Sequence, residues 1–181
     1  MKNEHPEEEK PKGILINKYL AQAGLCSRRK ADEYIEKGWV AVNGQTIDQL
    51  GYKVQPEDEV TFKGEPVERK EKPVYLLLNK PKNTISTASD PRGRRTVIDI
   101  VGKKIEERVF PVGRLDRDTT GLLLLTNDGE LAERLAHPRH EVKKVYHVTL
   151  DKEVPEEHIQ AIAAGLTLDD GLAPVDSVSH V

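Results

Sequence analysis

The sequence has little cysteine and no long apolar run, and both absences narrow the classes of protein to which it can belong. Cys26 is the single cysteine among 181 residues, which excludes an internal disulfide framework and a zinc site built from cysteines alone. No apolar stretch approaches the roughly 20 residues that cross a bilayer, and the N-terminus is acidic and polar, unlike a signal peptide. We therefore expect a cytoplasmic protein that does not bind membranes.

The charge of the chain is unevenly distributed. The net charge is −3, with 33% charged against 36% hydrophobic residues, a balance typical of thin cores and a large solvated or ligand-facing surface. Residues 151–181 sum to −6 and residues 1–10 to −2, which leaves +5 for residues 11–150. The net charge of the whole chain therefore conceals a positively charged central region, residues 11–150, that is suited to attracting a polyanion. Clusters of like charge are, however, more often only solvated faces.

Local patterns divide the chain into two folded parts. Residues 1–12, rich in Glu, Lys and Pro, predict a disordered lead, and residues 68–73 predict a linker. Between them, residues 13–67 should form a small domain with two helices, the second capped by Ser27, and a hairpin that turns at Asn43-Gly44.

Residues 74–181 should form a sheet with packed helices. The runs 74–78 and 122–126 are too continuously apolar to be half-exposed, so 74–78 is predicted as a central strand and 122–126 as another buried strand. Apolar residues alternate over 145–150, which would place Tyr146, Val148 and Leu150 on one face of a strand. The expected fold class is α+β with a mixed, mostly antiparallel sheet. Further expected elements are a strand at 109–112, helices at 96–101, 130–136 and 155–165, and a hairpin at 166–175.

A basic turn opens the second predicted helix. Ser27 is followed by Arg28, Arg29 and Lys30, and a helix N-terminus with free N–H groups and added cations is a suitable phosphate site. A merely solvated turn is the alternative, because cations at this end oppose the helix dipole at a cost of roughly 0.3–1 kcal/mol each.

The basic turn belongs to a wider pattern. Asn17-Lys18-Tyr19-Leu20, Ser27-Arg28-Arg29 and Val42-Asn43-Gly44 together resemble the small RNA-binding domain named after ribosomal protein S-four, over about residues 14–67. The resemblance implies that the two helices and the following hairpin grip folded RNA largely through its backbone. The RNA-contacting residues that it implies are Lys18, Ser27, Arg28, Arg29, Lys30 and Asn43.

The strongest candidate for catalysis is a carboxylate in a glycine-flanked loop. Asp116 lies in Gly113-Arg114-Leu115-Asp116-Arg117-Asp118-Thr119-Thr120-Gly121, directly before the apolar run 122–125. Rigid strands on both sides would hold it in place, and Arg114 and Arg117 would keep it ionised and attract phosphates. From the loop alone, a structural Asp that caps a turn is the favoured alternative, and Asp118 fits that description.

The stretch from Gly113 to Gly129 closely resembles the signature of the RsuA-type pseudouridine synthases, which modify ribosomal RNA. The catalytic Asp of that family aligns with Asp116, and its downstream Lys-x-Tyr motif aligns with Lys144-Val145-Tyr146. An RNA-binding domain ahead of this motif is also the usual order in the family. The leucine run 122–125 and His137-Pro138-Arg139-His140 look most like the members that act on large-subunit RNA.

The resemblance implies a cofactor-free isomerisation of uridine to pseudouridine. The enzyme would flip the uridine out of the RNA, break its N-glycosidic bond, rotate the base and reattach it through carbon. Asp116 would act on the ribose or on the base, and Tyr146 would stack on the uracil and handle a proton, with an ordinary core tyrosine as the alternative. Arg114, Arg117 and Lys144 would bind the substrate, since stacking and cationic contacts offset the cost of base flipping.

The chain also departs from the pattern of this family. Members continue through further strands and a helix whose arginine pairs with the catalytic Asp, and residues 150–181 hold no counterpart, so we expect a truncated chain. The second hypothesis is therefore an RNA-binding module without catalysis, inactive or acting in ribosome assembly. No metal-ligand spacing or phosphate-cradling glycine loop points to other chemistry. We expect no metal and no cofactor, a monomer, and ribosomal RNA as the partner.

RNA binding should weaken as salt rises. Lysines and arginines that neutralise phosphates release counterions, so the logarithm of Kd should rise linearly with that of the salt concentration, by about 0.7 per phosphate contacted on a single strand. Fluorescence anisotropy of a labelled ribosomal RNA fragment at four KCl concentrations measures this slope. An affinity that does not change with salt would contradict the basic surface.

Overall fold

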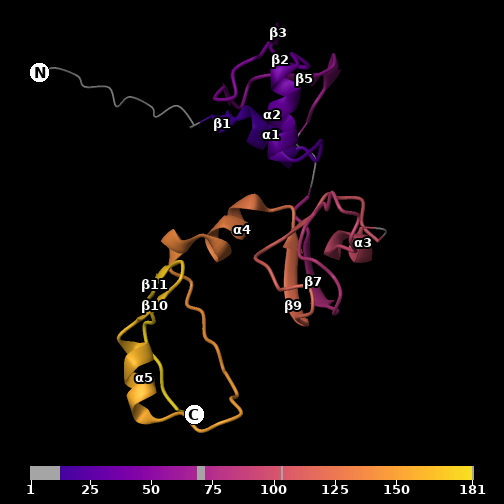
Figure 1. The fold of residues 1–181 in the computed structure, drawn as a ribbon. Helices are drawn as coiled ribbons and strands as arrows, with labels where there is room; N and C mark the ends of the chain where they lie inside the picture. Colours follow the sequence, from indigo (N-terminus) through magenta and orange to yellow (C-terminus); the bar gives the residue numbers. More distant parts are fainter. Residues whose placement is uncertain (1–12, 69–71, 103, 181) are drawn as a thin grey trace, which may run out of the picture. The chain divides into compact units, whose positions relative to one another are not determined.

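Figure 1 traces the computed structural model, which describes residues 13–68, 72–102 and 104–180. The predicted lead over residues 1–12 lies outside the described residues, as do residues 69–71 of the predicted linker. The chain divides into two compact units, with the boundary between Val142 and Lys143. The first unit holds an N-terminal domain, from β1 to β6, and a sheet domain, from β7 to α4.

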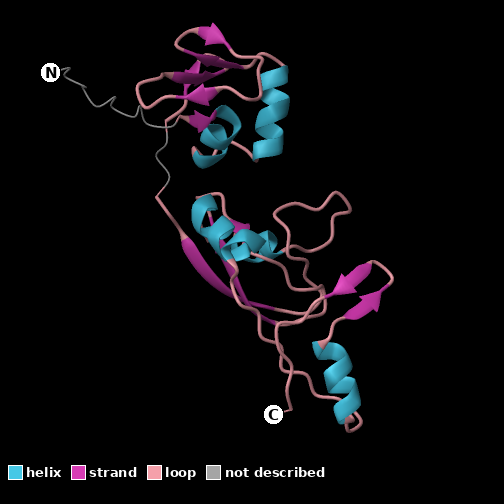
Figure 2. Ribbon diagram, turned by 90° about the vertical axis from the view of Figure 1, so that its left-hand side faces the viewer, coloured by secondary structure: helices cyan, strands magenta, loops and turns pink. Residues whose placement is uncertain are grey.

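In the N-terminal domain, two helices lie against short antiparallel strands (Figures 1 and 2). One sheet has the order β3-β2-β5-β6, and β1 pairs with β4. Ile16, Leu20, Ala31 and Ile35 from the helices are fully buried and share a core with strand residues such as Val40. The elements are β1 (Ile14–Leu15), α1 (Ile16–Gln22), α2 (Arg28–Glu36), β2 (Val40–Val42), β3 (Gln45–Thr46), β4 (Lys53–Val54), β5 (Val60–Phe62) and β6 (Glu65–Pro66).

Local sequence signals position these elements as predicted. The Ser27 side chain accepts a hydrogen bond from the backbone N–H of Lys30 at 3.2 Å and so caps α2. Asn43 and Gly44 have φ values of 50° and 78°, the left-handed conformations that a tight two-residue hairpin turn requires. The predicted cap and the predicted turn are therefore both confirmed.

An aromatic cluster covers the edge of this core. Trp39 lies with its ring centroid 5.4 Å from that of Tyr34 and 6.2 Å from that of Phe62. The Lys63 ammonium lies 3.9 Å from the Trp39 centroid, within the range of an attractive cation–π contact. The cluster joins the end of α2 to β5 and the turn that follows it.

The sheet domain is built on three antiparallel strands in the order β7-β9-β8. Leu76 pairs with Leu125 and Lys80 pairs with Gly121, so the end of β7 lies beside the start of β9. Val97 of α3 packs with Leu123 and Leu125 of β9 in the core. The elements are β7 (Tyr75–Lys80), α3 (Val97–Val101), β8 (Phe110–Pro111), β9 (Gly121–Thr126), α4 (Gly129–Ala136) and a 3₁₀ turn, η1 (Pro138–His140).

The prediction that 74–78 is a fully buried central strand is wrong. β9 is the central strand of the described sheet and β7 lies at its edge. Leu77 and Leu122 are each 68% exposed, whereas Leu123 and Leu125, on the other face of β9, are buried. A continuous leucine run is apolar on both faces, and its pattern does not tell which face is packed.

The second unit contains α5 (Glu156–Ala163) and the hairpin of β10 (Leu166–Leu168) and β11 (Gly171–Ala173), as predicted. The strand predicted over 145–150 is wrong, because residues 141–150 form neither helix nor strand. Val145 and Tyr146 are 82% and 81% exposed. Alternation of apolar residues is not sufficient for a strand, because the backbone also needs a hydrogen-bonding partner strand, and none of the described strands pairs with this segment.

The α+β fold class is confirmed. Every strand pair in the described ranges is antiparallel, and Ile85 and Thr96 add an isolated parallel bridge. Short helices pack in the N-terminal domain and on the sheet. Over the part of the chain that the structure describes, no helix combines the length and hydrophobicity that crossing a membrane takes.

Replacing Leu125 with Ala should lower the free energy of unfolding by about 2–5 kcal/mol, because it leaves a cavity in a packed core. Leu122→Ala is the matched control on the same strand, and its exposed side chain should cost less than about 0.5 kcal/mol. Urea denaturation of the two variants compares them. Equal losses would show that the exposed and buried faces of β9 are wrongly assigned.

Candidate active site

A pocket of about 480 Å³ lies in the sheet domain, beside the glycine-flanked loop that follows β8. Two chain segments form its walls: one precedes α3 and the other is the loop itself. The lining residues are Ile85, Ser86, Thr87, Ser89, Asp90, Arg94, Arg114, Leu115, Asp116 and Arg117. The structure thus brings Arg114, Asp116 and Arg117, the predicted residues of the loop, to one pocket.

The loop carrying Asp116 is short and closed on itself. Gly113 and Gly121, at φ values of 73° and 140°, let the backbone reverse between β8 and β9. The Thr119 N–H donates to the Asp116 carbonyl oxygen at 3.1 Å, and the half-buried Leu115 side chain packs against the sheet core. The Asp116 residue itself is exposed, so its carboxylate can be reached by a substrate from solvent.

The buried side chain of Lys80 holds this loop through hydrogen bonds to its backbone. It is fully buried at the end of β7, and its ammonium group donates to the carbonyl oxygens of Thr119 at 2.7 Å, Arg117 at 3.1 Å and Pro81 at 3.1 Å. Three acceptors satisfy the three N–H donors of a lysine, which makes its burial tolerable. This role of Lys80 was not predicted from the sequence. A charged residue that ends an apolar strand was the available signal.

The other pocket wall is tied to the loop by its backbone and by Ser86. The Ser86 hydroxyl donates to the Leu115 carbonyl oxygen at 2.7 Å and accepts from the Leu115 N–H at 3.1 Å. The Thr84 N–H donates to the Arg117 carbonyl oxygen at 3.2 Å. These bonds hold the backbone on both sides of Asp116, while its side chain stays exposed.

The arginines that flank Asp116 differ in their surroundings. Arg117 is turned toward Asn83, with its Nε 2.7 Å from the amide oxygen and its Nη2 also in contact with it. Arg114 makes no side-chain hydrogen bond or ion pair within the described residues. In the same residues neither arginine forms a salt bridge with Asp116, which leaves Arg114 as a cation available to a ligand in the pocket.

The pocket contains a charged pair, Asp90 and Arg94, that was not predicted from the sequence. Asp90 accepts from both Nε and Nη2 of Arg94, at 3.1 and 2.8 Å. These side-chain bonds, together with the bond from the Arg94 backbone N–H, lower the pKa of Asp90 to about 2. The Asp90 carboxylate is therefore ionised, and its pair with Arg94 intact, at every pH above the usual carboxyl range near 4. The pair weakens only as the pH falls toward 2, where the carboxylate becomes protonated.

Lys144 and Tyr146 lie in the second unit and not among the residues that line the pocket. Both are exposed, in the segment whose strand prediction failed. Their assigned roles, substrate binding for Lys144 and uracil stacking for Tyr146, stay predictions that rest on the Lys-x-Tyr motif.

The predicted RNA-contacting residues fall into two groups. Ser27 caps α2, Lys30 donates to Glu33 at 2.6 Å, and Asn43 bridges to Asp58 and Glu59 at 2.8 and 2.9 Å. Their side chains therefore have roles within the domain, and the hydrogen bond to Glu33 raises the pKa of Lys30. Lys18 is half-buried and its ammonium donates to Glu130 at 3.1 Å. The second group, more available to a ligand, is Arg28, which has only a 3.5 Å contact with Asn17, and the exposed Arg29.

No group of three or more His, Cys, Asp or Glu side chains suited to a metal ion occurs within residues 13–68, 72–102 and 104–180. His137 instead accepts from the Arg139 N–H and caps η1. The charges at the pocket are those of arginines and carboxylates, and the described arrangement suits binding of an anionic ligand next to a reactive carboxylate.

Replacing Lys80 with Met should destabilise the loop, because the carbonyl oxygens of Pro81 and Thr119 lose the ammonium donor and that of Arg117 keeps only the Thr84 N–H. We expect a loss of about 2–4 kcal/mol in the free energy of unfolding, and faster hydrogen exchange at the Thr84 and Thr119 amides. Lys82→Met, an exposed lysine two positions along, is the control and should stay within about 0.5 kcal/mol of the parent. Unchanged exchange in Lys80→Met would show that the ammonium does not hold the loop.

Comparison with known proteins gives the family of the chain. Residues 74–177 match the family described as RNA pseudouridylate synthase, and residues 15–60 match the S4 domain. These matches agree with the two resemblances recognised in the sequence, the catalytic signature and the RNA-binding domain that precedes it.

Several relatives are similar over most of the chain. The ribosomal large subunit pseudouridine synthase B of Bacillus subtilis is 47% identical over 156 residues, which cover 86% of this chain and 63% of that protein. An uncharacterized RNA pseudouridine synthase of Aquifex aeolicus is 46% identical over 93% of this chain and 68% of its own length. The dual-specificity RNA pseudouridine synthase RluF of Escherichia coli is 40% identical over 86% and 53%.

A crystal structure of a pseudouridylate synthase matches 87% of this chain and 67% of its own, with 31% identity and a TM-score of 0.49. The chain spans 63% of the length of the Bacillus relative and about half of that of the Escherichia one. Since the family match covers more than half of the chain and includes the Asp116 loop, the chain belongs to the RNA pseudouridylate synthase family.

Proposed function

We propose that this chain provides the RNA-binding and catalytic residues of a ribosomal RNA pseudouridine synthase, with Asp116 as the catalytic carboxylate. The observation that carries the proposal is an exposed Asp116 on a loop anchored by Lys80 and Ser86, at a pocket lined by Arg94, Arg114 and Arg117. A rigid carboxylate next to cations suits chemistry on one nucleotide of a polyanion. We further propose that the protein acts in the cytoplasm, as its substrate requires.

Large-subunit ribosomal RNA is the proposed substrate. The relative with 47% identity is a ribosomal large subunit pseudouridine synthase, and its alignment covers 86% of this chain. The leucine run after the Asp116 loop and the stretch His137-Pro138-Arg139-His140 support the same choice. The Escherichia relative is a dual-specificity enzyme, so a second RNA substrate is a natural comparison in any assay.

The reaction is an isomerisation in which no atom is gained or lost by the nucleotide. The bond between N1 of uracil and C1′ of ribose breaks, the base rotates, and a bond forms between C5 and C1′. The hydrogen on C5 leaves as a proton and N1 regains one. Asp116 would assist by acting on the ribose or on the base, while the anchored loop restricts the backbone from which the carboxylate reaches either target.

Base flipping has to precede this step, because the target atoms are not reachable within a stacked strand. Flipping costs a few kcal/mol, and cationic contacts to the phosphates on either side offset part of that cost. Arg114, whose side chain has no partner within the described residues, is the proposed contact at the pocket. Arg28 and Arg29 at the start of α2 are the proposed contacts of the N-terminal domain, with Tyr146 proposed to stack on the uracil.

Asp116→Asn should abolish release of tritium from uridine labelled at C5 in large-subunit RNA transcripts. Loss of the carboxylate removes the group that acts on the substrate, so we expect the rate to fall at least about a hundredfold. Asp118→Asn is the matched control: it removes the same charge from the same loop and should leave the rate within about threefold, as expected for a residue that only faces solvent.

The comparison also separates the two functions considered for the chain. Release that depends on Asp116 but not on Asp118 establishes the isomerase. RNA binding without release, in a chain that also stays inactive when extended at its C-terminus, would favour the non-catalytic RNA-binding module. Equal effects of the two substitutions would contradict the assignment of Asp116 as the catalytic residue.

A further inference from the structure

The Asp90–Arg94 pair forms part of the pocket wall that faces the Asp116 loop. The Asp90 side chain is only 5% exposed, whereas that of Arg94 is 48% exposed. The carboxylate therefore lies within the wall and the guanidinium extends from it.

The hydrogen bonds divide the Arg94 guanidinium into a fixed edge and an available one. Asp90 accepts from Nε and from Nη2, which uses two of the five N–H donors of an arginine. Nη1 makes no hydrogen bond or ion pair within the described residues. A planar guanidinium that is held along one edge is oriented before a ligand arrives, so little conformational freedom is lost on binding.

The charge around Arg94 selects the kind of ligand. Arg94, Arg114 and Arg117 line the pocket together with Asp90 and Asp116, which leaves an excess of one positive charge before the ligand enters. Arginine donors arranged in a plane match the oxygens of a phosphate. A phosphate that met Arg94 would therefore be balanced by cations from both walls of the pocket.

We propose that Arg94, positioned by Asp90, binds a phosphate adjoining the uridine that enters the pocket beside Asp116. The proposal rests on the proposed function, since it assigns the flanking phosphate of that same nucleotide. It adds a binding residue outside the Asp116 loop and a positioning residue, Asp90, that acts only through the guanidinium. The reactive carboxylate then lies on one wall of the pocket and the phosphate contact on the other.

Removing the Arg94 side chain should leave the loop folded. The backbone N–H of Arg94 donates separately to Asp90 Oδ2 at 2.8 Å, and the Gly93 N–H donates to the Asp90 carbonyl oxygen at 3.2 Å. Both bonds close the turn without the guanidinium. Arg94→Gln therefore tests binding more directly than folding, and its melting temperature provides the check.

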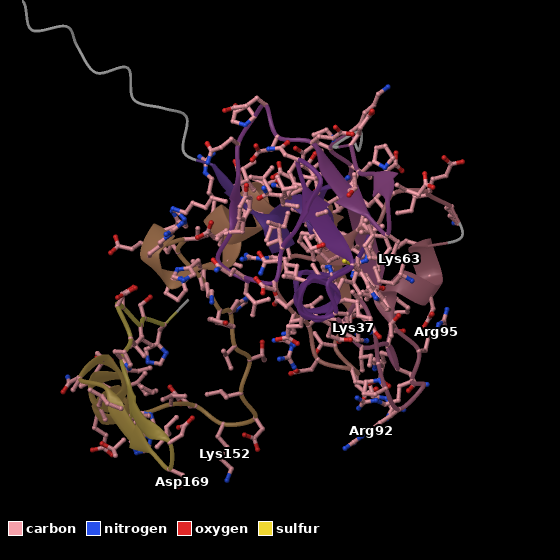
Figure 3. The ribbon with its side chains drawn as sticks, turned by 90° about the horizontal axis from the view of Figure 1, so that it is seen from above. Lys37, Lys63, Arg92, Arg95, Lys152 and Asp169 are labelled. Carbon is pink, nitrogen blue, oxygen red and sulfur yellow. The ribbon has the colours of Figure 1, made fainter. Side chains whose placement is uncertain are left out.

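The same loop offers matched controls. Arg92 and Arg95 are exposed and do not line the pocket, and Figure 3 shows their side chains pointing outward. Arg92→Gln and Arg95→Gln each remove one positive charge from the segment that carries Arg94. Any effect of overall charge on bisphosphate binding should therefore appear in all three variants, and an effect of the pocket in Arg94→Gln alone.

The experiment compares uridine 3′,5′-bisphosphate with uridine as probes, titrated into the ¹⁵N-labelled chain and followed by NMR at the amides of Ser86, Thr87 and Leu115. A charge-assisted phosphate contact should make the bisphosphate bind about tenfold more tightly than uridine. Arg94→Gln should lose this preference, while Arg92→Gln and Arg95→Gln should keep it within about twofold. Equal behaviour of the three variants, or no preference in the parent, would overturn the proposal.

Asp90→Asn separates positioning from simple charge. The substitution makes the pocket more positive, so electrostatics alone should strengthen binding of the bisphosphate. If Asp90 positions the guanidinium, the preference for the bisphosphate should fall instead, with the melting temperature and the amide spectrum outside residues 86–95 unchanged. A stronger preference in Asp90→Asn would refute the positioning role.

The outcome is distinguishable from that of the proposed function, because tritium release that depends on Asp116 is measured separately. Active enzyme with an unaltered phosphate preference in Arg94→Gln would leave the isomerase standing and remove this inference. A preference that depends on Arg94 without tritium release would keep the phosphate site and remove the isomerase.

Discussion

The buried ammonium group of Lys80 is the interaction on which the candidate active site depends. It lies at the end of β7, next to the first residue of β9, and donates to carbonyl oxygens in the loop that joins β8 to β9. A loop of this kind has few hydrogen bonds of its own, and a backbone carbonyl left without a donor in the interior is costly. Lysine suits the position because its long apolar stem can follow the strand while the ammonium reaches the loop.

The loop is also held from its other side, and this determines the character of the pocket. Ser86 bonds both the N–H and the carbonyl group of Leu115, directly before Asp116. Because the backbone is fixed, the side chains of Arg114, Asp116 and Arg117 project from a rigid frame. The chain as a whole is acidic, yet the pocket that these residues share with Arg94 has an excess of positive charge. The electrostatic environment of a site follows from the local fold more than from the net charge.

Features that depend on near neighbours in the sequence could be predicted. The Ser27 cap involves a residue three positions away, and the Asn43-Gly44 turn needs only the conformations of its own two residues. The Asp116 loop was found because its glycines and the leucine run after it are visible in the sequence. The fold class followed from the same local signals.

Features that depend on partners distant in the sequence could not be predicted. The side chains of Lys80 and Ser86 donate to carbonyl oxygens that lie between 29 and 39 positions further along the sequence. Asp90 and Arg94 are relevant because they line the same pocket as the Asp116 loop. The strand expected around Tyr146 failed for a related reason, since alternation does not supply a partner strand. The exposed Leu77 and Leu122 show the same limit, because an apolar run does not tell which face the fold will cover.

The aromatic cluster of the N-terminal domain contains a residue whose fluorescence can be excited selectively. Trp39 is the single tryptophan of the sequence, and it lies half-buried against Tyr34 and Phe62 beneath the Lys63 ammonium. Excitation at the red edge of its absorption therefore selects the N-terminal domain, while the Asp116 pocket stays spectroscopically silent. The wavelength of its emission is set by the polarity and charge around one ring, so the chain has a built-in optical reporter for the RNA-binding domain alone.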